Sequence, residues 1–283
     1  MAASLLAATT GFPVRSPAAE LLDLKRDADL LRAYQKMRFS MGPELNIGWL
    51  RAKRFAVSQG RVEPLCGLVA ATFSRVNRVT DDLFEVIVLE ITHYTDFDSG
   101  ALLQTLTMPF TNQLIEVPAY RFGPAKSRFS VRLNETESFA PAANTNEGEF
   151  AAAGQVAMTK SLELSRIHAG DAFLRHEEYG RVYPANTELP SMFYKESTTW
   201  SAPLREVADS EQRQVDATVS YAAMTSWRPW MKMGDTPGHT SSNGFGRRAR
   251  SVEDLPDDFL AYTRETAPDV LDDPLAALTE PEI

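Results

Sequence analysis

The segment LFEVIVLEITHY, residues 83–94, constrains the fold more than any other part of the sequence. Its β-branched and aromatic residues predict a long β-strand, whose successive side chains point to opposite faces. One face would carry Phe84, Val86, Val88, Glu90, Thr92 and Tyr94, and the other Ile87, Leu89, Ile91 and His93. Because both faces are largely apolar, we expect one to line the interior of a barrel and the other to pack beneath a helix.

Turn-forming residues follow this strand at positions 96–100, and the apolar segment ALLQTLTM comes next, at 101–108. This order predicts a β-hairpin. Apolar and polar residues also alternate in RFSVRL, 128–133, and over 215–223, which predicts two more antiparallel strands with one solvent-facing side.

Helices are expected near the two ends of the chain. Ser16 and Pro17 have the form of an N-cap and a first helical residue, and apolar residues recur at helical spacing as far as Met41. Pro256 is expected to open a second, short helix, and the prolines at 268 and 274 are expected to stop further helix.

The sequence therefore predicts a single, mainly β (α+β) domain over residues 1–283. Its form would be an antiparallel β-barrel or strongly curved sheet with an N-terminal amphipathic helix and a short C-terminal helix. Residues 1–15 are interpreted as an N-terminal extension and 16–267 as the body. Residues 134–154, low in large aliphatic residues, are interpreted as a loop insertion, either a surface excursion or a lid.

The net charge of −9 is concentrated at the C-terminal end. From Glu253 onward there are ten acidic residues and one basic residue, whereas the rest of the chain is neutral. Nucleic acid binding requires a basic face, so we expect no nucleic acid partner. Residues 268–283 are interpreted as an acidic tail that serves solubility or a contact with a partner protein.

The single cysteine, Cys66, excludes an intramolecular disulfide, and its apolar neighbours predict a buried side chain instead of a nucleophile. The N-terminus lacks the basic region of a signal peptide. No apolar stretch reaches the roughly 18 to 20 residues that span a bilayer. We therefore expect a cytoplasmic protein with no membrane partner.

Glu90 and Tyr94 share one face of the strand at 83–94 and are candidate catalytic residues. A carboxyl group in apolar surroundings has a raised pKa, which suits it to general acid or base catalysis. The alternative is structural, with Glu90 paired to an arginine or bound to backbone donors. His93, on the same strand, is a candidate for substrate binding.

Two further segments combine aromatic rings with cationic groups. MFYKESTTW, residues 192–200, supplies the substrate-binding candidates Tyr194 and Lys195. TSWRPWMKMGDTPGH, residues 225–239, supplies Trp227, Arg228, Trp230 and Lys232. Such groups either bind an aromatic anion or pack at the edge of the core. In the first case Arg228 would bind the anionic group, the two tryptophans would stack on its rings, and Lys232 would be a catalytic acid or base.

No motif indicates a metal or a nucleotide cofactor. HAGDAFLRHEEYG, residues 168–180, lacks a metal-ligand spacing and is interpreted as a polar surface stretch. Gly244 and Gly246 imitate part of a dinucleotide-binding motif, but the segment before them does not predict a strand. The chain contains neither a Walker loop nor the G-x-S-x-G turn of serine hydrolases. We expect no cofactor and no metal.

The run PWMKMG at 229–234, followed by Pro237-Gly238 and later by Asp254-Leu255-Pro256, resembles the C-terminal signature of the family called domain of unknown function 1838 (DUF1838). The segment from Glu90 and Tyr94 to the turn Pro109-Phe110-Thr111 is also similar. The resemblance covers residues 25–265.

Three residues depart from the pattern of that family: Met108, Asn112 and His239. These differences affect the identity of a substrate more than the fold. The resemblance implies little chemistry, apart from an association of some bacterial members with the breakdown of aromatic compounds.

Three functions fit these features. The first is a cofactor-independent lyase or decarboxylase acting on a phenolic molecule, such as a lignin-type dimer, through a quinone-methide-like intermediate. The second is a non-catalytic binding protein for a hydrophobic aromatic ligand, and the third is a regulatory protein that binds a partner through its acidic tail. Apolar strand faces in excess of one core also predict a homodimer.

Overall fold

The computed structural model describes residues 22–81, 83–130, 136–139, 153–162, 164–184 and 191–279. An 11-stranded antiparallel sheet dominates it, in the order β6-β3-β2-β1-β13-β12-β11-β10-β8-β7, with β9 paired to β10. Its strands are β1 (Asn46–Ser58), β2 (Arg61–Thr80), β3 (Leu83–Thr95), β6 (Tyr120–Ser130), β7 (Thr136–Phe139), β8 (Ala153–Ser161), β9 (Arg166–His168), β10 (Asp171–Pro184), β11 (Met192–Pro203), β12 (Thr218–Ser226) and β13 (His239–Ala249).

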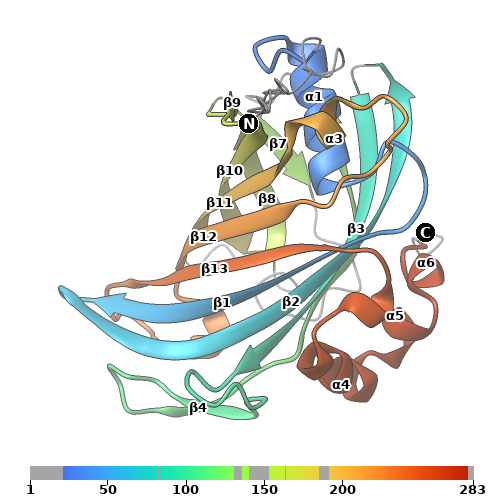
Figure 1. Ribbon diagram of the computed structural model, residues 1–283. Coiled ribbons are helices and arrows are strands. Elements are labelled where there is room, and N and C mark those ends of the chain that lie inside the picture. Colours follow the sequence, from blue (N-terminus) through green and yellow to red (C-terminus); the bar gives the residue numbers. More distant parts are fainter. Residues whose placement is uncertain are drawn as a thin grey trace, which may run out of the picture.

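The sheet curls strongly into a half-barrel, with β6 and β7 at its two ends within the described part of the chain (Figure 1). The predicted mainly β, strongly curved antiparallel sheet is therefore confirmed. Long strands such as β2 and β3 twist along their length, and this twist produces the curl.

Strand β3 has the two faces that its sequence predicts. Val88, Glu90, Thr92 and Tyr94 line a cavity on the concave side of the sheet. Ile87, Leu89 and Ile91 are buried on the convex side, where they pack with helix α4 (Asp257–Thr266). The period-2 alternation of a strand thus divides this one segment between a binding cavity and a core.

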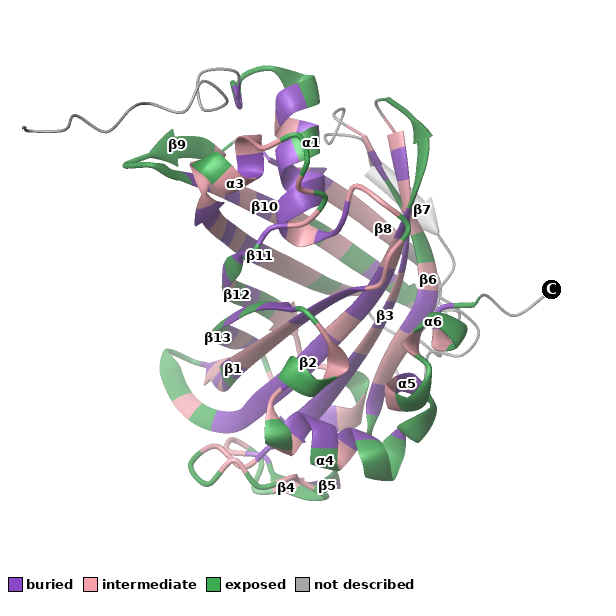
Figure 2. Cartoon of the chain, turned by 45° about the vertical axis from the view of Figure 1, so that its right-hand side comes forward, coloured by how far each residue is buried: buried purple, intermediate pink, exposed green. Residues whose placement is uncertain are grey.

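Helix α1 (Asp27–Arg38) covers one end of the concave side (Figures 1 and 2). Its residues Leu31, Tyr34 and Met37 are buried against Val86 and Phe129 of the sheet. The predicted amphipathic helix is confirmed, but it begins ten residues later than expected at Asp27, because residues 22–26 form a turn around Asp23. Residues 16–21 lie outside the described residues.

The opposite end is closed by a small two-stranded sheet and by the segment around the 3-10 helix η2 (Pro229–Met231). The small sheet consists of β4 (Thr105–Thr107) and β5 (Leu114–Glu116). The hairpin predicted between 83–94 and 101–108 is therefore wrong. The chain does turn at 96–100, but the second segment forms only an isolated bridge, Thr95 to Leu102, because β2 and β6 already pair with both edges of β3.

Three short helices pack on the convex side: α4, α5 (Pro268–Asp272) and α6 (Pro274–Ala277) (Figure 1). The helix after Pro256 is confirmed, but the later prolines do not stop helix formation. Each occupies the first turn of a new helix, where its missing N–H has no intrahelical partner to lose. The predicted acidic tail is consequently part of the folded body up to Thr279, with Val270 and Leu278 fully buried.

Two other local predictions have separate outcomes. The range 134–154, predicted as a loop insertion, contains strand β7 and the first two residues of β8, and its residues 134–135 and 140–152 lie outside the described residues. Cys66 is buried, as predicted, and burial raises the pKa of its thiol to about 11. The remaining short helices are α3 (Leu204–Ala208) and η3 (Val252–Asp254).

Candidate functional site

A cavity of about 300 Å³ lies on the concave side of the sheet, between the end covered by α1 and the end closed by η2. Its walls come from β1, β2, β3, β6, β8, β10, β11 and β12. Apolar and aromatic side chains form most of the lining, and a small number of ionisable groups interrupt it. A concave, mostly apolar cavity with a few polar groups is the usual form of a small-molecule site.

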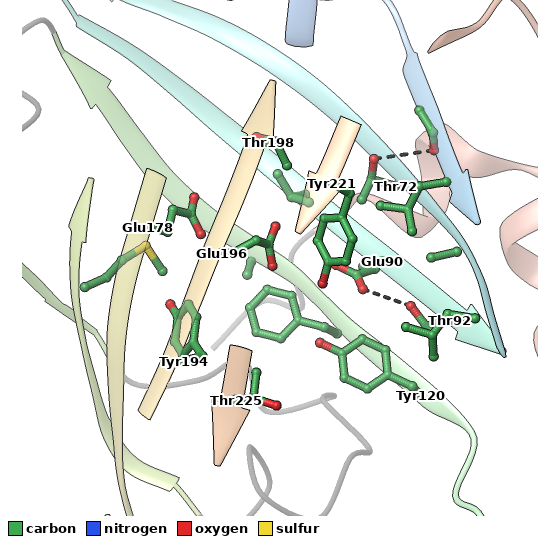
Figure 3. Close-up of a pocket in the computed structure, with 18 of the residues that line it drawn as sticks. Thr72, Glu90, Thr92, Tyr120, Glu178, Tyr194, Glu196, Thr198, Tyr221 and Thr225 are labelled. Atoms are coloured by element: carbon green, nitrogen blue, oxygen red, sulfur yellow. Dashed lines mark hydrogen bonds between the residues drawn. The ribbon is translucent and has the colours of Figure 1, made fainter. Parts of the chain in front are cut away.

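Two glutamates share one wall of this cavity. Glu178 on β10 and Glu196 on β11 are directly opposite each other in the antiparallel pairing. Figure 3 shows their carboxyl groups side by side, above Tyr194. Directly opposed like charges destabilise a pair of strands, so one carboxyl group gains by retaining its proton.

Glu196 is the group that retains its proton. Burial, and then the charges of Glu178 and Glu90, raise the pKa of Glu196 to about 8, against the opposing effect of Arg38 and Arg228. At neutral pH the folded protein therefore holds Glu196 largely as the neutral acid. The pattern is that of carboxyl groups crowded in one site, where both cannot be charged.

Glu90 lies on the opposite wall, on β3, beside Tyr221 and Thr92 (Figure 3). The Thr92 hydroxyl donates a hydrogen bond to Glu90 Oε1 at 2.9 Å. Three carboxyl groups from two walls thus face one cavity. The charges of Glu178 and Glu90 both raise the pKa of the third, Glu196.

Arg38, at the C-terminal end of α1, brings a positive charge to the glutamate wall. Its Nη1 lies 3.8 Å from Glu178 Oε1 and 2.9 Å from Nδ1 of His176. Burial, together with the charges of Arg38 and Lys160, lowers the pKa of His176 well below its usual value. His176 is therefore neutral at physiological pH. Arg38 is one cation near Glu178, and Lys160 lies opposite Glu178 in the pairing of β8 with β10.

Arg54 on β1 lies toward the other end of the cavity. Its side chain is buried at 4% exposure, its Nε donates to Ser242 Oγ at 3.0 Å, and its guanidinium lies 5.6 Å from the centre of the Tyr94 ring. Within the described part of the chain no hydrogen-bond acceptor reaches its Nη1. Arg228 also lines the cavity, close enough for its positive charge to repel that of Arg54.

Four tyrosines also line the cavity: Tyr94, Tyr120, Tyr194 and Tyr221. Burial, followed by the negative charges of Glu178 and Glu196, raises the pKa of Tyr194. Burial and Glu196 raise that of Tyr221 likewise. The hydroxyl groups of Tyr194 and Tyr221 therefore stay neutral, and all four tyrosine hydroxyl groups can donate or accept hydrogen bonds along a ligand.

Four of the residues proposed from the sequence come together in the cavity: Glu90, Tyr94, Tyr194 and Arg228. The other five lie outside its lining: His93, Lys195, Trp227, Trp230 and Lys232. Strand parity explains His93 and Lys195, because each follows or precedes a cavity residue by one position and so points to the opposite face.

His93 instead packs under α4. Its Nε2 lies 2.8 Å from Thr263 Oγ1, and burial lowers its pKa to about 4 despite the charge of Asp258. Lys195 places its amine 5.2 Å from the centre of the Tyr179 ring. Both residues have structural surroundings that account for them.

The segment 227–233 contributes more side chains to the core than to the wall of the cavity. Met231 and Met233 are buried, Trp230 packs on Tyr94 with ring centres 5.2 Å apart, and the Trp227 indole N–H donates to the Thr236 carbonyl at 2.9 Å. Lys232 adopts a left-handed backbone conformation, with φ of 51°, and is exposed. Its role as a catalytic base in the cavity is not compatible with that position.

Six charged residues of the cavity lining were not proposed as site residues from the sequence: Arg38, Arg54, Lys126, Lys160, Glu178 and Glu196. The stretch 168–180 was interpreted as a polar surface, yet His176 is buried and Glu178 faces the cavity. The alternation of side chains along a strand could have indicated Glu196, because it is two residues from Tyr194 and therefore points to the same face. Arg54 and Glu178 depend on strand pairings that the local sequence does not specify.

Within the described residues, no three His, Cys, Asp or Glu side chains converge in a way that could hold a metal ion. No helix of that part of the chain has the length and apolar character needed to cross a membrane.

Comparison with known proteins identifies the family of the chain. The profile of the family described as "Protein of unknown function (DUF1838)" matches residues 47–282, which include the described strands of the half-barrel, apart from the first residue of β1, and the three C-terminal helices. No curated protein sequence matches the chain. The match spans most of the sequence and agrees with the PWMKMG signature. The chain therefore belongs to the DUF1838 family.

Proposed function

We propose that the protein is an enzyme that cleaves a carbon–carbon bond of a phenolic small molecule by acid and base catalysis, without an added cofactor. The observation that carries the proposal is the placement of Glu196 directly opposite Glu178 in an aromatic cavity, with Glu90 on the facing wall, an arrangement that raises the pKa of Glu196. A carboxyl group with a pKa near neutrality is a general acid that works at physiological pH.

Glu90 is the proposed base and Glu196 the proposed acid. For a phenol with a hydroxyl group on the benzylic carbon, Glu90 accepts the phenolic proton while Glu196 protonates the benzylic hydroxyl. That hydroxyl leaves as water, and the electrons of the phenolate form a quinone methide. The phenol ring thus serves as the electron acceptor for the next step.

A hydroxymethyl group on the adjacent carbon then returns its O–H proton to Glu196. The bond between the adjacent carbon and the hydroxymethyl carbon breaks, and formaldehyde leaves. The electron pair of that bond forms an alkene and restores the phenolate, which regains its proton from Glu90. The net change is loss of water and formaldehyde, with both carboxyl groups restored. A carboxylate in place of the hydroxymethyl group would leave as carbon dioxide, and Glu196 would then be reprotonated by solvent.

The remaining cavity groups have supporting roles in this scheme. Tyr94 lies two positions from Thr92 and four from Glu90 on the same face of β3, where its hydroxyl can bind the phenolic oxygen. The ring of Tyr194, together with Phe122 and Trp200, supplies apolar surface for an aromatic ligand. Lys232 has no part in it, because it is exposed outside the cavity.

The test is incubation of the protein, without added cofactor, with lignin-type phenolic dimers, followed by ultraviolet absorbance of the conjugated product. We expect conversion by the wild type and by Glu211→Gln, an exposed control, and a loss of roughly a hundredfold or more in Glu196→Gln and Glu90→Gln. A substrate with a methylated phenol is the matched control, because it cannot form the quinone methide. Conversion of the methylated compound, or equal rates in all variants, would refute the scheme.

The second candidate is a binding protein for an aromatic ligand without turnover. The observation that favours it is the predominance of apolar residues in the lining, such as Leu68, Val88 and Val219. Tight binding of the phenolic dimers with no change in absorbance would support this function over the first.

A further inference from the structure

We propose that Arg54 is the anchor of an anion-binding subsite that holds a carboxylate of the ligand at the end of the cavity nearest Tyr94. Arg54 lines the cavity, is 4% exposed, and has a buried Nη1 that no acceptor among the described residues reaches. The inference names the substrate class and to that extent rests on the proposed function, but the subsite itself does not.

The side chains that contact Arg54 carry no negative charge. Cys66 on β2 and Ser242 on β13 are its direct neighbours in the strand pairing, and Tyr94 lies under its guanidinium. In the part of the chain that the structure describes, no carboxylate forms an ion pair with Arg54. A buried cation without a counter-charge is costly, because burial favours the neutral form of a charged group and arginine does not lose its proton.

A second cation, Arg228, lies near Arg54. Arg228 lines the same cavity and repels Arg54 electrostatically. Arg228 therefore cannot compensate the buried charge of Arg54, whereas a negative group on a ligand can. The fork of N–H groups on arginine matches the two oxygens of a carboxylate.

The remaining surroundings of Arg54 favour a carboxylate on an aromatic molecule. The rings of Tyr94, Tyr120 and Tyr221 line the cavity with Arg54 and provide flat apolar surface together with one hydroxyl group each. The ligand class is therefore a phenolic compound with a carboxylate.

That carboxylate is not the group that leaves. An arginine that binds the charge of a carboxylate stabilises the ground state and slows its loss as carbon dioxide. The subsite therefore selects substrates whose carboxylate stays on the product, remote from the bond that breaks. Within the proposed function, this favours the release of a neutral one-carbon fragment.

The experiment is calorimetric titration of the wild-type protein with 4-hydroxycinnamate and with its amide, which has the same shape without the charge. We expect the acid to bind roughly ten- to a hundredfold more tightly, the usual effect of one charge-assisted pair. Arg54→Met should abolish this preference, whereas Lys53→Met should retain it. Lys53 is the matched control, because it is the adjacent residue, carries the same charge and is exposed.

A second measurement guards against a variant that does not fold well. If Arg54 serves the ligand, Arg54→Met in the ligand-free protein should have a Tm equal to or above that of the wild type, because an uncompensated charge has been removed. A lowered Tm, with equal loss of affinity for acid and amide, would assign Arg54 a structural role and overturn the proposal. Equal affinity of the wild type for acid and amide, or no binding of either at millimolar concentration, would overturn it without any variant.

The two proposals fail in different ways. Binding of 4-hydroxycinnamate through Arg54 without conversion of any phenolic dimer would refute the lyase and leave the subsite in place. Conversion of neutral phenolic dimers, with no preference for the acid, would refute the subsite and leave the lyase.

Discussion

Glu178 and Glu196 face each other across neighbouring antiparallel strands, and both carboxyl groups point into the same cavity. A pair of like charges at this position is unfavourable unless one of them is neutral. The protein resolves the conflict by keeping the proton on Glu196 and placing Arg38 beside Glu178. The first two predictions follow from this arrangement.

Glu196 makes the stability of the protein fall as pH rises. Its pKa is about 8 in the folded state and 4.5 as the reference value, so between these pH values the folded state binds more protons than the unfolded state. The free energy of unfolding should decrease by on the order of 1 kcal/mol per pH unit over this window. Glu196→Gln should remove that slope, measured by urea denaturation at pH 5.5, 6.5 and 7.5, whereas the exposed control Glu211→Gln should retain it.

Glu178→Gln should move the same transition to lower pH. Removal of the Glu178 charge removes the second largest of the effects that raise the pKa of Glu196, after burial. Glu196 would then ionise earlier in the folded state, and the decline in stability would end at a lower pH. Denaturation curves from pH 5 to pH 9 would measure the shift, and an unchanged transition would show that the two groups are not coupled.

On the convex side, the hydrogen bond between His93 and Thr263 should contribute measurably to the free energy of unfolding. Thr263→Val removes the hydroxyl 2.8 Å from His93 Nε2 and leaves a buried ring nitrogen without that partner. We expect the free energy of unfolding at pH 7 to fall by about 1–3 kcal/mol. Thr266→Val, on the exposed side of the same helix, is the control and should change it by less than about 0.5 kcal/mol.

The acidic C-terminal segment should behave as core. Leu278 is fully buried, whereas Leu275 in α6 is 45% exposed. Leu278→Ala should lower the free energy of unfolding by about 2–4 kcal/mol, and Leu275→Ala by less than about 1 kcal/mol, as measured by chemical denaturation. Equal and small effects would mean that α5 and α6 contribute little to the body of the protein.

Gly180 gives Tyr194 its place in the cavity wall. It lies opposite Tyr194 in the strand pairing, and a Cβ at this position would lie 2.0 Å from Cε1 of the tyrosine ring. Gly180→Ala should therefore displace the ring and lower the free energy of unfolding by about 1–3 kcal/mol. In a Tyr194→Ala background the same substitution should cost much less, and a double-mutant cycle would measure the difference.

Local sequence patterns predicted the features that depend on one segment at a time. The two faces of residues 83–94, the amphipathic helix that ends at Arg38 and the helix after Pro256 are of this kind. The hairpin at 83–108 failed because β3 takes its partners from β2 and β6, a choice made by the whole sheet. The prolines at 268 and 274 were misjudged because the same residue ends one helix and begins another.

In the candidate site, too, the sequence predicted residues that belong to a local pattern and missed those that depend on strand pairing. Glu90, Tyr94, Tyr194 and Arg228 were recognisable because an ionisable or aromatic residue stood within a visible pattern. Glu178 and Arg54 were not, because only the pairing of β10 with β11, and the pairing of β1 with its two neighbours, bring them into the cavity. Lys232 was misplaced because the left-handed turn at that residue directs it to solvent. The homodimer and the aromatic substrate stay predictions.

The division of β3 between cavity and core also has an evolutionary consequence. Alternate residues from Val88 to Tyr94 line the cavity, while the intervening residues of the strand, Ile87, Leu89 and Ile91, pack with the C-terminal helices. Substitutions at Val88, Glu90 or Thr92 can therefore alter what is bound without loosening the scaffold. A lineage built on this strand can exchange one chemistry for another by mutating alternate codons, and the half-barrel remains intact throughout the change.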